Sequence, residues 1–232
     1  MKKDKEKKKP DYNKNIALMR LKDMLSDGLP TLVKWNFMFF VSCLPVVTIG
    51  PALAALYHCV NLLVRNELPQ EKSGRLYINS FKSAFSKTIV SGLLIFLSNI
   101  MLYTGFYVYI SMSSQNIIYI PMASLSLIGL IIIYSIICHF FPAVFTSADF
   151  STGISVVSDK TTKEMLQNAL EDSFKNPKKT LLAAIISLIV YPAQLLFFPA
   201  SIPLILTIGL IIPVVAAGFA HTEPEKEMYI IG

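Results

Sequence analysis

Four uninterrupted apolar runs occupy much of the chain. They cover residues 89–110, 117–145, 181–198 and 202–220, and none contains Asp, Glu, Lys or Arg. A helix of about 20 apolar residues crosses the roughly 30 Å hydrocarbon core of a bilayer. Because lipid offers the backbone no hydrogen-bond partners, each run is predicted to be helical. The pattern therefore predicts an all-α, polytopic membrane protein with four clear transmembrane helices, and Pro142 marks a bend in the second.

The N-terminal apolar region is interrupted. Two short apolar stretches, 35–47 and 52–64, flank a segment that contains Pro45, Gly50 and Pro51. Proline removes a backbone donor and disfavours helix in the residue before it, and glycine permits a turn. This pattern predicts a helix, a break and a second helix. Each arm is short for a helix that crosses the whole bilayer, so the pair forms either two short spans or a re-entrant hairpin. The break is predicted to be covered by other helices.

Positive charge lies only between these runs. Of the 21 Lys and Arg residues, ten precede residue 35, five lie in 65–87 and five in 160–179. The positive-inside rule places these segments on the cytoplasmic side of a bacterial plasma membrane. The interrupted region must then enter and return, and the C-terminal tail ends inside. The net charge of +6 is explained by orientation, so nucleic acid is not a predicted partner.

The chain is predicted to hold one membrane domain with short flanks. Residues 1–28 form a basic cytoplasmic segment that is too polar to fold fully on its own and is partly disordered. Residues 29–220 form the helical membrane domain, and residues 221–232 form a short cytoplasmic tail.

Two amphipathic segments are predicted to be interfacial helices. One covers 77–87, and the other covers 161–175, where Thr161 and Glu164 have the spacing of a capping box. Each leads into a pair of apolar runs, which suggests two copies of one unit. The repeat favours a pseudo-symmetric transporter; the alternative is two unrelated helices lying on the inner leaflet.

The best candidate site is a group of polar residues in the second arm. His58, Asn61 and Arg65 share one helical face, with Tyr57 beside them, and Asn36 in the first arm could pair with Asn61. Polar side chains at membrane depth often mark function. One interpretation is a pocket for a solute or partner helix beside the break. The other is a set of interhelical hydrogen bonds that hold the bundle, with Arg65 reaching the inner interface.

The sequence contains no pattern typical of a catalytic or metal site. Phosphate-binding, dinucleotide-binding, zinc-protease and serine-hydrolase motifs are missing. His58, His139 and His221 lie far apart, and the three cysteines form no CxxC pair. His139 is interpreted as a satisfied core histidine rather than a proton relay. No enzyme, cofactor or metal is predicted.

Residues 42–50 (SCLPVVTIG), followed by 54–57 (AALY), resemble the signature of the YesL-like family of bacterial membrane proteins. The segments 80–82 (SFK) and 174–177 (FKNP) are similar to weaker parts of its pattern. The long lysine-rich leader departs from it. The resemblance implies a small polytopic protein associated with carbohydrate-uptake systems, with neither an enzymatic activity nor binding residues to transfer.

Together, these observations predict a non-enzymatic accessory protein of the bilayer. Its expected partner is a carbohydrate transporter permease or a second copy of itself. The alternative is a small solute transporter or channel that uses the broken hairpin between Pro45 and Pro51.

Overall fold

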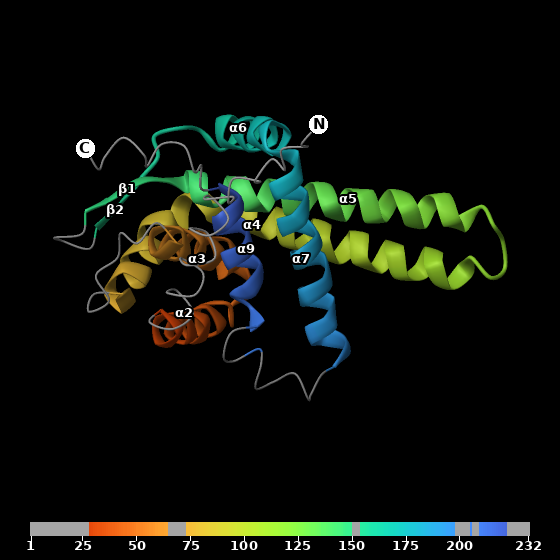
Figure 1. The fold of residues 1–232 in the computed structure, drawn as a ribbon, viewed down its shortest axis with the longest axis horizontal. Helices are drawn as coiled ribbons and strands as arrows, with labels where there is room; N and C mark the ends of the chain where they lie inside the picture. The colour runs from red at the N-terminus through yellow and green to blue at the C-terminus, as the bar shows by residue number, and fades with distance from the viewer. Residues whose placement is uncertain (1–27, 65–72, 150–153, 198–204, 206–208, 222–232) are drawn as a thin grey trace, which may run out of the picture.

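The computed structural model describes residues 28–64, 73–149, 154–197, 205 and 209–221. The fold of these residues is helical, as predicted (Figure 1). Its helices are α2 (Leu29–Ser42), α3 (Ile49–Val64), α4 (Ser73–Met112), α5 (Tyr119–Phe140), α6 (Thr162–Lys175), α7 (Pro177–Leu196) and α9 (Ile212–His221). Short 3₁₀ turns cover Val46–Thr48 and Pro142–Val144, and a two-stranded antiparallel sheet, which the sequence pattern did not predict, joins β1 (Phe145–Asp149) and β2 (Ile154–Val157).

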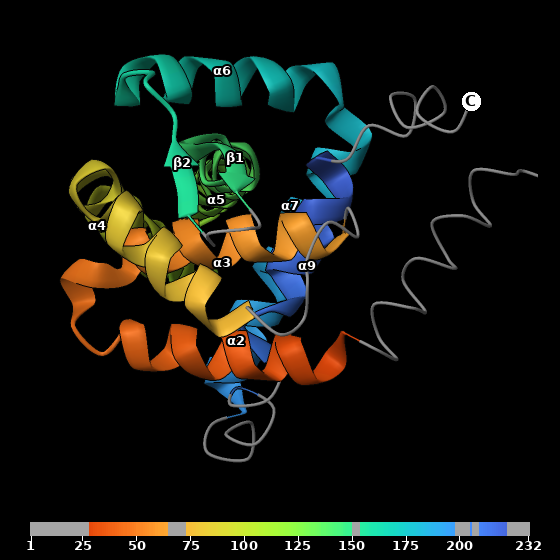
Figure 2. The same ribbon diagram turned by 90° about the vertical axis from the view of Figure 1, so that its left-hand side faces the viewer.

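The interrupted N-terminal region forms the predicted helix, break and helix. α2 and α3 lie side by side and run in opposite directions (Figure 2). The hydroxyl of Thr48 closes the break, 2.5 Å from the carbonyl oxygen of Ser42 and 2.6 Å from that of Pro45. The helix–break–helix pattern is therefore confirmed, while the entry and return of this region through a membrane stays a prediction.

Two details of the break differ from the prediction. Gly50 and Pro51 are buried, but Leu44 is 70% exposed and Pro45 and Val46 are exposed as well. The first half of the break is therefore not covered by the described residues. Gly50 is also not a turn residue, because it lies in the first turn of α3.

Gly50 instead permits a close approach of two backbones. A Cβ atom on Gly50 would lie 2.1 Å from the carbonyl oxygen of Thr88, and one on Gly92 would lie 2.1 Å from the Cα of Gly50. Real Cβ atoms do not approach other atoms so closely, so side chains larger than hydrogen are excluded at both positions. This contact fixes α3 against α4.

The predicted interfacial helix at 77–87 is not a separate element. It is the beginning of α4, a single helix of 40 residues. Neither proline nor glycine occurs between Tyr77 and Ser91, so nothing interrupts the backbone hydrogen bonds between the polar segment and the apolar run.

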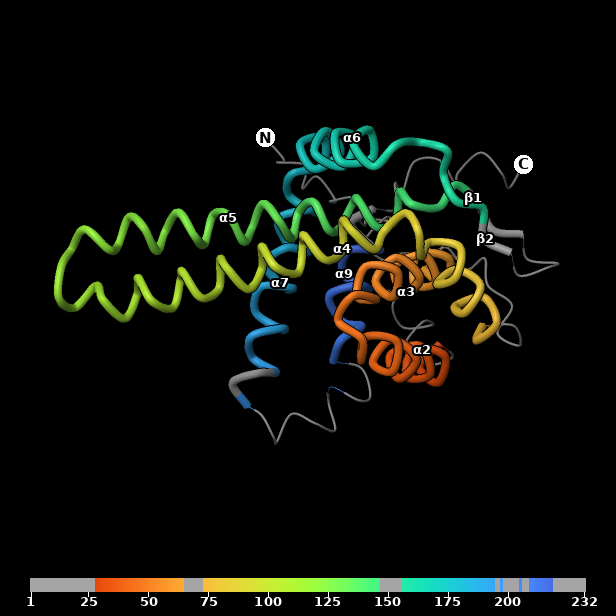
Figure 3. The backbone as a smooth tube through the Cα atoms, turned by 180° about the vertical axis from the view of Figure 1, so that it is seen from behind, coloured from red at the N-terminus to blue at the C-terminus, as the bar shows by residue number. Residues whose placement is uncertain are grey.

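α4 and α5 form a long hairpin that projects from the other helices (Figures 1 and 3). Small residues bring the two helices together: a Cβ on Gly105 would lie 3.4 Å from Ser126 Oγ, and one on Gly129 would lie 3.1 Å from a methyl group of Leu102. α5 ends at Phe140, two residues before Pro142. Pro142 therefore ends the α-helix rather than bending it.

The predicted capping box is present at the start of α6. Thr161 Oγ1 accepts from the backbone N–H of Glu164 at 3.3 Å, and Glu164 Oε2 accepts from the backbone N–H of Thr161 at 2.8 Å. α6 ends at Lys175, and α7 begins at Pro177. Proline is favoured in the first turn of a helix and disfavours helix in the residue before it. The amphipathic helix α6 and the apolar helix α7 are therefore separate, whereas the corresponding two segments of the first predicted copy form the single helix α4.

Among the described residues, three segments are long and apolar enough to cross a membrane: Val46–Val64, Ser73–Met112 and Tyr119–Val144. The predicted third run forms α7, with Pro192 inside it, but α7 is not one of these three. Residues 202–204 and 206–208 of the predicted fourth run, and the turn at Pro199, lie outside the described residues, and the second half of that run forms α9, a helix of 10 residues. α7 runs across the α4–α5 hairpin rather than alongside it (Figures 1 and 2).

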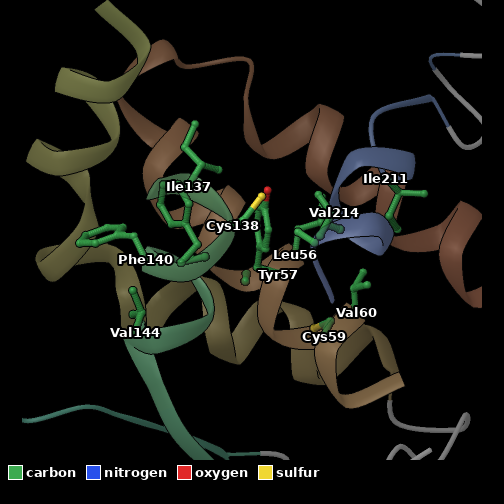
Figure 4. Close-up of a cluster of buried hydrophobic side chains, with 14 of the residues drawn as sticks. Leu56, Tyr57, Cys59, Val60, Ile137, Cys138, Phe140, Val144, Ile211 and Val214 are labelled. Carbon is green, nitrogen blue, oxygen red and sulfur yellow. The ribbon is translucent and has the colours of Figure 1, made fainter. Parts of the chain in front are cut away.

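The core lies at the base of the hairpin, around α3. Leu56 and Val60 of α3 pack with Val214 of α9 and with the end of α5 (Figure 4). α3 is thus the central helix of the fold, and its polar residues lie inside the protein.

Candidate functional site

The predicted polar residues of α2 and α3 are gathered at the centre of the fold. Asn36 is fully buried, Tyr57 and His58 are nearly so, and Asn61 is half-buried. Arg65 lies outside the described residues. Among the described residues, the contacts of these side chains are separate: Tyr57 and His58 contact the segment after α5, and Asn36 contacts Ile205.

Tyr57 and His58 contact the segment that follows α5. The ring of Tyr57 stacks on Phe141 with a centroid distance of 5.8 Å, and the ring of His58 stacks on Phe145 at 4.2 Å. Stacking of this kind adds about 0.5–1.5 kcal/mol beyond the burial of the rings. The two residues therefore join α3 to the place where the chain leaves α5 and enters β1.

Asn36 makes a different contact from the one predicted. Its Nδ2 donates to the backbone carbonyl of Ile205 at 2.6 Å, and no hydrogen bond joins it to Asn61 in the described part of the chain. Within that part, the amide oxygens of Asn36 and Asn61 are buried and have no hydrogen-bond partner. A buried acceptor without a donor costs about 1–3 kcal/mol of stability. A hydrogen-bond donor brought to either of these two oxygens would therefore be stabilising.

A cluster of tyrosines, which the sequence analysis did not single out, adjoins this region. The hydroxyls of Tyr103 in α4 and Tyr134 in α5 lie 3.1 Å apart, and the ring of Tyr134 stacks on Tyr191 of α7 at 5.9 Å. Tyr57 lies within electrostatic range of Tyr134, Tyr191 and Cys138. Its hydroxyl and the Cys138 sulfur lie together in the close-up (Figure 4).

The tyrosine cluster joins α4 and α5 through a hydrogen bond and α5 and α7 through stacked rings, with Tyr57 of α3 close by. Its signal in the sequence is the position of Tyr103, Tyr134 and Tyr191 inside apolar runs. Tyrosine at a membrane usually lies near the ends of a span, where its hydroxyl reaches water. A tyrosine far from those ends must find its hydrogen-bond partner inside the protein.

His139 is buried and bonded, as its interpretation as a core histidine requires. Its Nε2 lies 2.9 Å from the hydroxyl of Thr180 at the start of α7. A second hydrogen bond lies at the other end of α7, where Gln194 Nε2 donates to the carbonyl of Gly209 at 2.6 Å. These bonds attach α7 to α5 and to the segment that precedes α9.

The chemistry of these groups is hydrogen bonding between helices. In the described residues, no three His, Cys, Asp or Glu side chains come together in a way that could hold a metal ion. Cys59 and Cys138 are free and buried. The site offers amide oxygens, phenols and two imidazoles in an apolar surrounding, which can bind a polar group or hold helices together.

Comparison with known proteins gives one similarity. Residues 32–106 match the model of a family described as "Protein of unknown function, DUF624". The matched residues include most of α2, the break, α3 and most of α4, and with them the segments 42–57 and 80–82. They make up less than half of the chain. No curated protein and no solved structure matches the chain.

Proposed function

We propose that this chain is a multi-pass membrane protein without enzymatic activity that acts by binding another membrane protein. The observation that carries this proposal is the α4–α5 hairpin, which stands away from the core and exposes apolar side chains along its length. Met101 of α4 is 78% exposed and Leu125 of α5 is 69% exposed. Covering one such side chain is worth about 1.5–3 kcal/mol, so a hairpin with many of them requires a nonaqueous surrounding.

The dimensions of the hairpin fit a bilayer. The section of α4 beyond Lys87 carries no charge and, at 1.5 Å per residue, is roughly 37 Å long. α5 has 22 residues, or roughly 33 Å. The turn between the helices contains Ser113, Ser114, Gln115 and Asn116, so its tip is polar. An apolar hairpin with a polar tip is the form expected of two connected spans.

Polar residues on the hairpin support a protein partner in addition to lipid. Ser98 and Thr104 are exposed on α4 at membrane depth. The amide of Asn99 donates to the carbonyl of Ile95 at 2.9 Å, while its oxygen has no partner in the described part of the chain. Ser, Thr and Asn side chains in membrane helices form hydrogen bonds across helix interfaces. Ser98 and Thr104 are therefore the polar side chains of α4 that a second helix could reach, while the oxygen of Asn99 is buried.

The class of partner rests on the sequence resemblance. The YesL-like pattern implies an association with bacterial carbohydrate-uptake systems, and the similarity of residues 32–106 to DUF624 lends it support at the level of the family. We therefore propose a carbohydrate transporter permease as the partner. Residues 88–140, which form the apolar part of the hairpin, contain no Asp, Glu, Lys or Arg. This composition supports a binding role over a coupled transporter, because such transporters commonly use ionisable groups inside the membrane.

Crosslinking and affinity capture from native membranes test this proposal. A C-terminally tagged chain is expected to recover a permease in near-equal amount. The Asn99→Leu and Ser98→Leu variants should lose the permease, whereas Leu125→Ile, which keeps an apolar side chain on the other helix, should retain it. Recovery of the tagged protein only with itself, at normal expression, would contradict the accessory role.

A second function, solute transport, is favoured by the broken α2–α3 pair and its buried polar groups. A helix break at membrane depth and amide oxygens without partners are features of transporter binding sites. Flux of candidate sugars into proteoliposomes that contain the purified protein tests this alternative. Flux that is abolished by Asn61→Leu would replace the accessory role with a transport role.

A further inference from the structure

α6 has two apolar faces, and the protein covers only one of them. Met165 and Ala169 are fully buried between α6 and the helices beneath it. Leu166, Leu170 and Phe174 follow one another at intervals of one helical turn and form a second row, which we call the outer row. Phe174 is 79% exposed, Leu166 is exposed and Leu170 is half-buried. Isolated apolar residues on a surface need no explanation, but a row of them does.

Hydrogen bonds hold α6 at a defined level of the hairpin. Ser173 Oγ lies 3.3 Å from the carbonyl oxygen of Ser135 in α5. The ammonium of Lys87 in α4 bonds to the carbonyl of Ser158, just before α6. Lys87 is the last charged residue of α4, and on α5 the exposed apolar residues end at Ile132. α6 therefore lies where the apolar part of the hairpin begins.

The direction of α6 fits a membrane surface. Its axis runs across the hairpin rather than along it (Figures 1 and 2). If the hairpin crosses the bilayer, α6 must lie parallel to the membrane plane at the level of the headgroups. A helix in this position places its apolar row about 5–10 Å into the boundary between headgroups and acyl chains.

The distribution of charged side chains along α6 also fits a membrane surface. Lys163 lies three residues before Leu166 and seven before Leu170, on the side of the outer row, and is exposed. Lys178, also exposed, lies four residues after Phe174, beyond the break between α6 and α7. Glu164 lies away from Leu166 on the helix, Glu171 borders the row three residues before Phe174, and Asp172 is paired with Lys175 at 2.8 Å. Cations next to an apolar row match the surface of a lipid leaflet, which has apolar acyl chains inside and anionic headgroups outside.

We propose that the outer row of α6 is a lipid-binding surface for the anionic cytoplasmic leaflet. Leu166, Leu170 and Phe174 enter the boundary of the acyl chains, and Lys163 and Lys178 bind the phosphates of anionic phospholipids. The inference rests on the part of the proposed function in which the hairpin crosses the bilayer, and is independent of any protein partner. Each lysine at such a surface strengthens binding about fivefold, since it contributes roughly 1 kcal/mol.

Fluorescence quenching by lipids that carry a quencher near the headgroup tests this surface. The full chain is reconstituted in phosphatidylcholine with or without phosphatidylglycerol, as Phe174→Trp or as Asn168→Trp, a control on the side of α6 away from the outer row. The signal of the native Trp35 is subtracted with the unsubstituted chain. Phe174→Trp is expected to be quenched several-fold more than the control, and more strongly when phosphatidylglycerol is present.

Two results would overturn the proposal. Equal quenching of both tryptophans would show that the outer row does not face lipid. Quenching of Phe174→Trp that is unchanged by phosphatidylglycerol and by the Lys163→Gln/Lys178→Gln pair would show that no anionic lipid is recognised.

A third variant, Leu125→Trp with a quencher deep in the acyl chains, separates this inference from the proposed function. If Leu125→Trp is not quenched, the hairpin lies outside the bilayer and the proposed function falls; if it is quenched and Phe174→Trp is not, only the α6 inference falls.

Discussion

At the scale of single residues, the contact between Gly50 and Gly92 is the most sensitive feature of the fold. The atoms that a Cβ on Gly50 would meet belong to the backbone of α4, so no side chain can rotate away. We expect Gly50→Ala to destabilise the protein by about 1–3 kcal/mol, the usual cost of overpacking. Thermal unfolding in detergent, followed by the fluorescence of the single tryptophan, measures this loss.

Gly105→Ala is the matched control for that prediction. A Cβ on Gly105 would meet Ser126 Oγ at 3.4 Å, an ordinary contact. Because alanine is favoured over glycine in a helix by up to about 1 kcal/mol, Gly105→Ala should be neutral or stabilising. Equal unfolding temperatures for the two variants would show that α3 and α4 do not approach at Gly50.

The Tyr103–Tyr134 pair gives a second prediction at this scale. Phenylalanine at either position removes one hydroxyl and leaves the other without the partner it has at 3.1 Å. Each single variant should therefore lose more stability than half of what the double variant loses. A double-mutant cycle should give a coupling near the average of about 0.6 kcal/mol found for hydrogen bonds between membrane helices. A coupling of zero would mean that each hydroxyl has another partner.

At the scale of elements, the capping box of α6 is local enough to be tested alone. Thr161→Ala removes the oxygen that accepts from Glu164 N–H and should destabilise α6 by about 0.5–2 kcal/mol. Hydrogen exchange of the amides in the first turn of α6 should rise, while that of α5 stays the same. Thr162→Ala, at an exposed neighbouring position, is the control and should leave the exchange unchanged.

The elements also show where sequence patterns suffice and where they fail. The break at Pro45 and the capping box at Thr161 could be predicted because each depends on a few adjacent residues, whereas Pro142 was expected to bend the helix that it ends. The continuity of α4 could have been predicted from the missing proline and glycine between Tyr77 and Ser91, but amphipathicity there suggested a separate helix. The β1–β2 pair depends on contacts between two short segments, which periodicity does not reveal.

At the scale of the whole molecule, the arrangement of helices could not be derived from their sequences. Apolar runs predict spans but not their directions, so they could not show that α7 runs across the hairpin. The same holds for the candidate site. Helical spacing placed His58 and Asn61 on one face, but only the fold shows that Asn36 bonds to Ile205 and that tyrosines from four helices lie nearby.

If the projecting hairpin crosses the membrane, as we propose, its tip and its base lie on opposite sides. Its tip and its base are separated by roughly 33–37 Å of helix, and the base carries the charged segments. Ser114→Cys should therefore react with a membrane-impermeant maleimide in intact cells, and Lys160→Cys only after permeabilisation. The unsubstituted chain is the control: Cys59 and Cys138 are buried, and any labelling of the half-buried Cys43 is subtracted with it. Labelling of both variants from one side would mean that the hairpin lies along the membrane surface, because two ends of a spanning hairpin cannot share a compartment.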